Sequence, residues 1–90
     1  MPRYFFHVDD GVHVPDLDGT ECWDLDDARA QGLVAAGEML KDVDGNFWKD
    51  LSPWTMHVTD DANRLQFSLM FAAKIPSGEV AYVPSAPADD

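Results

Sequence analysis

The sequence predicts a small α+β fold, in which one helix packs on one face of an antiparallel sheet as a two-layer sandwich. Three observations predict this fold. An amphipathic helix spans residues 24–43, alternating apolar residues mark a strand pair near residues 54–72, and an aromatic run over residues 3–8 marks another strand. The predicted element order is β-β-α-β-β, and 90 residues suffice for one domain of this kind.

The helix over residues 24–43 is the element around which the other elements are arranged. Asp24 is placed to cap its N-terminus, Trp23 is placed to form a hydrophobic staple, and Gly45 is the expected left-handed residue after its end. Gly32 falls on the apolar side, where it allows the helix to approach the sheet closely. The apolar stripe at helical spacing contains Leu25, Ala28, Gly32, Ala35, Ala36, Met39, Leu40 and Val43.

The strands are predicted from period-two alternation. Residues 3–8 form the first strand, and residues 12–14 form a weak second strand that Pro15 confines to an edge. Residues 54–59 and 64–72 form the clearest hairpin. The predicted helix-facing residues include Tyr4, Phe6, Met56, Val58, Phe67 and Leu69, and Leu65 and Phe71 are also predicted to point inward. The second face is predicted to carry Phe5, His7, Thr55, His57, Ser68 and Met70.

Two segments lie outside these elements. Residues 46–53 are predicted to be an irregular connection whose Phe47, Trp48 and Leu51 fold back over one end of the core. Residues 1–73 therefore form a single α+β domain, and residues 74–90 form a Pro-rich acidic tail that we expect to be mobile. Residues 80–83 are the one apolar patch of that tail.

The charge balance limits the classes of partner. The chain has 17 acidic and 6 basic residues, a formal net charge of -11, which argues against direct binding of nucleic acid or of an anionic membrane surface. The same charge favours a basic protein partner. The single Cys22 excludes an internal disulfide, and no apolar run is long enough to span a membrane, so a cytoplasmic location is expected.

Several motifs resemble those of a known family. They are the opening M-P-R-Y-F-F-H-V-D-D-G, the D-x-x-G at Asp16–Gly19, the D-L-x-x-A-R at Asp24–Arg29, and the W-x-M-x-V-T-D at Trp54–Asp60. Together they resemble a widespread family of short, uncharacterised bacterial proteins classed as a domain of unknown function, over roughly Met1–Ala72. The resemblance implies a small bacterial protein without an established activity, cofactor or catalytic residue. A weaker similarity, carried by Val14–Gly19 and the start of the helix, is to the HicB-type antitoxin fold.

The candidate binding residues fall into two groups. The acidic group precedes the first base after Arg3 and contains Asp9, Asp10, Asp16, Asp18, Glu21, Asp24, Asp26 and Asp27. Turn chemistry and helix-dipole complementarity explain such acids, and the alternatives are a surface that imitates nucleic-acid phosphates or a cation site. His7 and His57 on adjacent strands form the other group, as partly exposed strand histidines or as ligands of a transition metal.

We therefore predict a non-enzymatic protein-interaction module, and assign no catalytic residue, cofactor or metal ligand. The alternatives are an antitoxin-like or nucleic-acid-mimicking inhibitor of a basic partner, and a small metal- or ligand-binding protein that uses His7 and His57. The predicted partner-binding residues are Phe5, His7, His57, Met70, Asp16, Asp18, Asp26 and Asp27. The second face of the sheet is either solvated or the contact of a homodimer.

Overall fold

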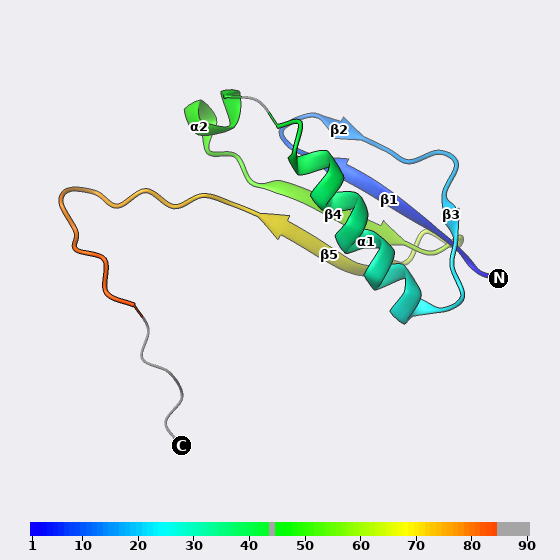
Figure 1. Ribbon diagram of the computed structural model, residues 1–90. Helices are drawn as coiled ribbons and strands as arrows, with labels where there is room; N and C mark the ends of the chain where they lie inside the picture. The colour runs from blue at the N-terminus through cyan, green and yellow to red at the C-terminus, as the bar shows by residue number, and fades with distance from the viewer. Residues whose placement is uncertain (44, 85–90) are drawn as a thin grey trace, which may run out of the picture.

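One main helix packs on one face of an antiparallel sheet, which confirms the predicted α+β class. The computed structural model describes residues 1–43 and 45–84. The elements are β1 (Arg3–Asp9), β2 (His13–Val14), β3 (Thr20–Glu21), α1 (Leu25–Leu40), α2 (Asn46–Asp50), β4 (Trp54–Thr59) and β5 (Leu65–Phe71). Helix α1 crosses the sheet obliquely, and α2 lies beyond its C-terminal end (Figure 1).

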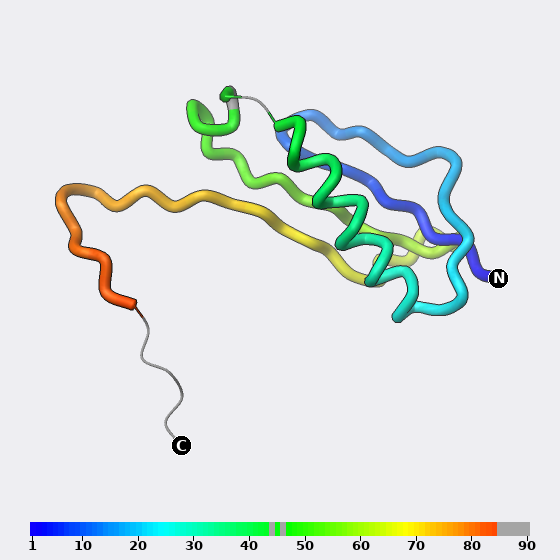
Figure 2. The backbone as a smooth tube through the Cα atoms, in the orientation of Figure 1, coloured from blue at the N-terminus to red at the C-terminus, as the bar shows by residue number. Residues whose placement is uncertain are grey.

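The strand order is β2-β1-β4-β5, and the short β3 also pairs with β1. The first strand of the chain therefore lies inside the sheet, between β2 and β4 (Figure 2). Phe6 of β1 pairs with Val58 of β4, which pairs with Phe67 of β5, so these three side chains form one row on the helix-facing side. The sequence predicted the hairpin and the weak edge strand but not β3.

The core combines large side chains from the sheet with small ones from the helix. Its buried apolar residues are Tyr4, Cys22, Ala28, Ala36, Trp54, Met56 and Val58. The buried residues of α1 are Ala28, Gly32 and Ala36, all of them small. A Cβ atom at Gly32 would lie 3.4 Å from Cζ of Phe67. The helix backbone thus lies close to the sheet, as predicted from Gly32.

The N-terminus of α1 is capped as predicted. Oδ1 of Asp24 accepts a hydrogen bond from the Asp27 amide at 2.9 Å, and Oδ2 of Asp27 accepts one from the Trp23 amide at 2.8 Å. Two amides that no helical carbonyl can reach are thereby satisfied. The predicted staple is wrong, because Trp23 is 75% exposed and Ala28, the N4 residue, is small and buried against the sheet.

The segment after α1 differs from the prediction. Helix α1 ends at Leu40, and Gly45, with φ of -66°, is not a left-handed stop but precedes the short helix α2. Leu51 instead takes the left-handed conformation and ends α2. Phe47 packs on Phe71 with ring centroids 5.7 Å apart, but Phe71 is itself 47% exposed. The predicted return over the core is wrong for Trp48, which is 61% exposed.

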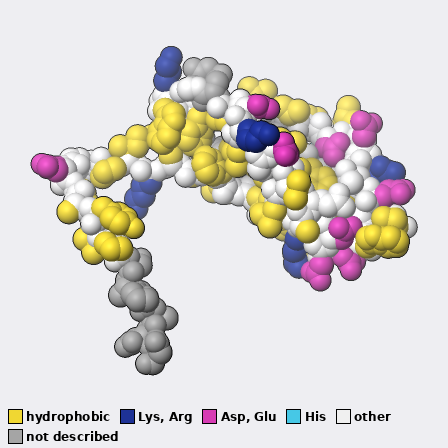
Figure 3. Space-filling view, viewed as in Figure 1, with side chains coloured by type: hydrophobic (Ala, Val, Ile, Leu, Met, Phe, Trp, Pro, Cys, Tyr) yellow, Lys and Arg dark blue, Asp and Glu magenta, His cyan; other side chains and the backbone are white. Residues whose placement is uncertain are grey.

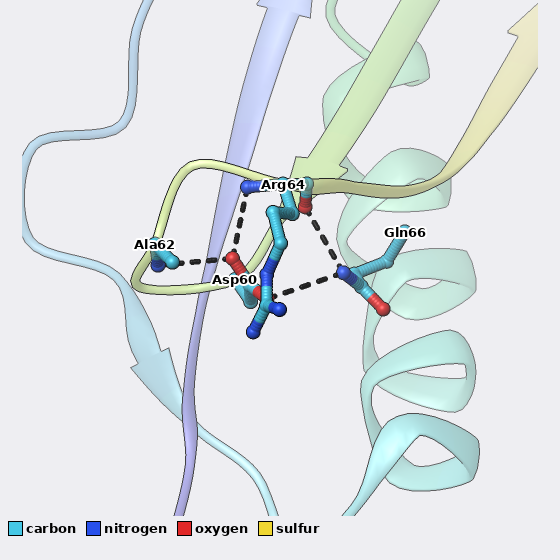
Figure 4. Close-up of polar contacts among 4 residues, drawn as sticks. All are labelled: Asp60, Ala62, Arg64 and Gln66. Carbon is cyan, nitrogen blue, oxygen red and sulfur yellow. Dashed lines mark hydrogen bonds and ion pairs between the residues drawn. The ribbon is translucent and has the colours of Figure 1, made fainter.

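The turn between β4 and β5 is held by the carboxylate of Asp60 (Figure 4). Its Oδ1 accepts hydrogen bonds from the amides of Ala62 and Arg64, both at 2.9 Å. Its Oδ2 accepts from Nε of Arg64 at 2.8 Å and from the Gln66 side chain at 3.3 Å. The Arg64 amide is the main cause that lowers the pKa of Asp60.

The predicted inward placement of two β5 residues is wrong, and the predicted tail lies only partly within the described chain. Leu65 and Phe71 are 62% and 47% exposed, not inward, because a register shift beside Thr59 displaces Leu65 and α1 does not cover the end of β5. Residues 72–84 form no helix or strand, and the arm they form leads away from the sheet (Figure 1). The last predicted tail residues, 85–90, lie outside the described part of the chain.

Candidate functional site

A groove lies where the end of β1, the edge strand β2, the end of α1 and helix α2 meet. Its volume is about 430 Å³. It is lined by Val8, Asp10, Val14, Met39, Asp42, Val43, Phe47, Asp50, Ser52 and Trp54. Most of the lining side chains are apolar. Figure 3 shows apolar side chains with acidic and basic ones beside them on this side of the molecule. The groove can therefore accept an apolar group from a ligand.

The groove follows from how the elements meet. Trp54 begins β4 and is only 4% exposed, so it forms the floor. Phe47 of α2 packs against Phe71 and closes one end. At the other side the turn after β1 is fixed by Oδ1 of Asp10, which accepts a hydrogen bond from the Val12 amide at 3.2 Å. Rigid elements thus hold the lining, and Met39 remains 42% exposed above it.

The electrostatics of the groove have one sign. Among the lining residues that the structure describes, Asp10, Asp42 and Asp50 carry carboxylates, and none is Lys, Arg or His. An anionic ligand would be repelled from such a rim, whereas a cation would be attracted. The geometry therefore selects a ligand that combines a positive charge with an apolar part.

His7 and His57 are register partners on the sheet face opposite α1, as predicted. The Asp16 amide donates to Nδ1 of His7 at 3.1 Å, so the ring proton belongs on Nε2, which lies 3.1 Å from Oγ1 of Thr59. Nδ1 of His57 lies 2.7 Å from the Ser68 hydroxyl. Both ring nitrogens of His7 are thus engaged within the chain, which disfavours metal binding by this pair.

Larger sets of metal-binding side chains give a separate finding. Among residues 1–43 and 45–84, no group of three or more His, Cys, Asp or Glu residues is arranged to hold a metal ion. Cys22 is fully buried, and burial, together with the nearby Asp27 and Asp24, raises the pKa of its thiol. A raised pKa keeps the sulfur protonated and unreactive.

Asp16 has a structural role at the edge of β1. Asp16 lies in the chain between the short strands β2 and β3. Its Oδ2 accepts a hydrogen bond from the Phe6 amide at 3.0 Å. Its Oδ1 accepts from the amides of Asp18 and Gly19, both at 3.1 Å. Burial acts to raise the pKa of Asp16, but these three amides and the nearby His7 outweigh it and lower the pKa.

The other predicted partner-binding residues lie in separate places. Asp27 caps α1, Asp26 pairs with Arg29 at 3.2 Å, and the backbone carbonyl of Asp18 accepts from Arg3 at 2.9 Å. Phe5 stacks on His7 with ring centroids 6.4 Å apart, and Met70 is 69% exposed on the same face. Asp26 and Asp27 thus lie in the helix layer, whereas Phe5, His7 and His57 lie on the sheet face opposite the helix. The structure brings together Phe5, His7, His57 and Asp16, whose amide donates to His7, but not the whole set.

Sequence reasoning missed the groove as a site. Its residues come from three separate parts of the chain, residues 8–14, 39–43 and 47–54, and no short motif contains them. One signal was available, because Phe47 is more apolar than a solvated connection requires. The three rim carboxylates were hidden among 17 acidic residues.

Comparisons with known proteins identify one family. A family described as "Domain of unknown function (DUF6894)" matches residues 3–72, which include every helix and strand of the structure. No curated protein and no solved structure matches the chain. The predicted resemblance to an uncharacterised family is confirmed, and the HicB resemblance stays a prediction. Within the described residues, no helix combines the length and the apolar character that crossing a membrane requires.

Proposed function

Because the chain belongs to DUF6894, a domain of unknown function, we propose its function from its geometry: it is a non-enzymatic protein-interaction module. Its groove binds an exposed basic segment of a partner protein. An apolar side chain of that segment enters between Val8, Val43 and Trp54, and neighbouring Lys or Arg side chains pair with the carboxylates at the rim. The apolar contact supplies affinity, and the charges supply orientation and a fast association.

One observation carries the proposal. The described lining of the groove combines an apolar floor with three carboxylates and no basic side chain, in a chain whose net charge is -11. A purely apolar pocket would accept any hydrophobic group, and a purely acidic patch would attract any cation. The combination selects the narrower class of segments that carry both features.

The N-terminal acids argue against the alternative of nucleic-acid mimicry. Asp9 and Asp10 accept hydrogen bonds from backbone amides in their own turn. Asp24 caps α1, and Glu21 pairs with Arg3 at 3.2 Å. These carboxylates follow the needs of turns and caps rather than a regular surface spacing, which is what the turn-chemistry interpretation predicts.

The test uses the full chain and two synthetic peptides. One peptide alternates Lys and Leu, and the other has Glu in place of every Lys. We expect the Lys peptide to shift the backbone amide resonances of Val14, Met39 and Phe47, and the Glu peptide to leave them unchanged. Shifts spread evenly over the surface, or equal shifts with both peptides, would contradict the proposal.

Two matched pairs of variants locate the site. The triple variant Asp10→Asn, Asp42→Asn, Asp50→Asn should bind the Lys peptide at least about tenfold more weakly, since three rim ion pairs are lost. Its control, Asp18→Asn, Asp61→Asn, Glu79→Gln, changes the net charge equally at exposed positions outside the groove. For the apolar lining, Val14→Thr is compared with Val12→Thr, since of these two residues Val14 lines the groove. Equal weakening within either pair would show that binding follows net charge or general surface changes instead.

A further inference from the structure

The two edges of the sheet are protected to very different degrees. At one edge, β2 has only two residues and is followed by Pro15. Beyond it, the Asp16 carboxylate accepts a hydrogen bond from the Phe6 amide, so that amide is not free to pair with another strand. At the other edge, β5 has seven residues, L-Q-F-S-L-M-F, with neither charge nor proline. Natural sheets usually protect such an edge with charges, prolines or short strands. No strand pairs with the outer side of β5 within the described chain.

Apolar side chains continue from this edge onto the helix. Gln31 and Ala35 of α1 line a hollow with Phe6 and Asp16 on the β1 side. Helical spacing therefore places Leu33 on the opposite flank of α1, towards β5, and Leu33 is 64% exposed. The strand edge and Leu33 form an open apolar border, and the exposed Asp26–Arg29 ion pair lies on the same flank of α1, one to two turns before Leu33.

The charges around this border favour a second copy of the chain as its occupant. Two molecules of net charge -11 repel one another, and the repulsion is weakest for an approach that brings no acids face to face. Strand β5 carries no acid, and Arg64 and Lys74 flank it. An uncharged strand can pair with its own copy without placing like charges opposite each other.

We propose that two copies of this chain associate by antiparallel pairing of their β5 edges around a twofold axis. The register that overlaps both strands fully centres on Ser68. It places Phe67 opposite the second copy's Leu69, and Leu65 opposite the second copy's Phe71. A twofold axis perpendicular to the sheet keeps both α1 helices on the same face, so each Leu33 faces the gap between them. The same register brings Lys74 beside the second copy's turn at Asp60–Asp61.

Sedimentation equilibrium of the full chain over a range of concentrations tests the proposal first. The expected result is a concentration-dependent species of twice the monomer mass. Leu65→Lys places a charge at the pairing edge and should weaken dimerisation at least about tenfold. Leu17→Lys is the matched control, because Leu17 is 84% exposed and lies between β2 and β3, which pair with β1 and not with β5, so it should leave dimerisation unchanged.

A crosslinking experiment tests the register without relying on a destabilising change. Ser68→Cys places a thiol at the twofold axis, and the natural Cys22 is fully buried and does not compete. Mild oxidation should give a covalent dimer with Ser68→Cys but not with Ser77→Cys in the arm. A monomer at every concentration would overturn the proposal. So would a dimer that persists with Leu65→Lys, does not crosslink through position 68, and dissociates with Phe5→Ser, because the contact would then be the open sheet face.

Discussion

Asp16 shows how one carboxylate can replace a stretch of sheet. Three amides donate to it, so Asp16→Asn should destabilise the fold by about 1–2 kcal/mol at neutral pH. The pKa of Asp16 is lowered in the folded state, so this stabilisation is present above the ordinary aspartate pKa of about 3.9 and is lost as the pH falls through the lowered value. Urea unfolding of both forms at neutral pH and near pH ~3 measures this. The difference should shrink in acid, and Asp18→Asn should have little effect at either pH.

Gly19 is the second residue on which this edge depends. Its φ is +73°, and a Cβ atom there would lie 2.8 Å from Cγ of Arg3 and 2.8 Å from Cε2 of Phe5. Gly19→Ala should therefore cost about 1–3 kcal/mol, from backbone strain and crowding together. Gly11→Ala is the control, since Gly11 also has a positive φ but no atom within 4 Å of its Cβ position. Thermal unfolding should show the larger loss for Gly19→Ala, and equal losses would mean that crowding adds nothing.

The glycines of α1 separate packing from helix propensity at the scale of an element. Gly37 lies in the helix with nothing within 4 Å of its Cβ position, so Gly37→Ala should stabilise the protein by about 0.5–1 kcal/mol. Gly32→Ala gains the same propensity but brings a methyl group to 3.4 Å from the Phe67 ring. It should gain less than Gly37→Ala in denaturant unfolding. An equal gain would show that the helix has room to move away from the sheet.

The elements also show which sequence signals sufficed for prediction. Alternation within β4 and β5 is local, and so is the Asp24 cap, so both could be read directly. Gly45 misled the prediction, because a glycine after a helix can also precede a second one. The groove could not be predicted, because it exists only where β1, α1 and α2 meet. Tertiary contact, not residue type, decides whether Phe47 lines a site.

For the whole molecule, the dominant electrostatic effect is repulsion among like charges. Acids outnumber bases by 17 to 6, and the Arg29–Asp26 and Lys41–Glu38 pairs are exposed at both ends, so each adds little. Raising sodium chloride from low concentration to about 0.15 M should therefore raise the Tm by ~2–4 °C. The control triple variant with three fewer negative charges should show a smaller rise. A Tm that falls with salt would mean that the ion pairs outweigh the repulsion.

The position of β1 inside the sheet has a consequence for synthesis of the chain. His7 and Thr59 bond across 52 positions, so the aromatic first strand leaves the ribosome long before its main partner exists. At about 5–20 residues per second, that delay lasts several seconds. The contacts between β4 and β5 are local in the sequence, so this hairpin can form first. It then serves as the template on which β1 docks. Refolding of the complete chain should therefore be limited by this docking step rather than by hairpin or helix formation.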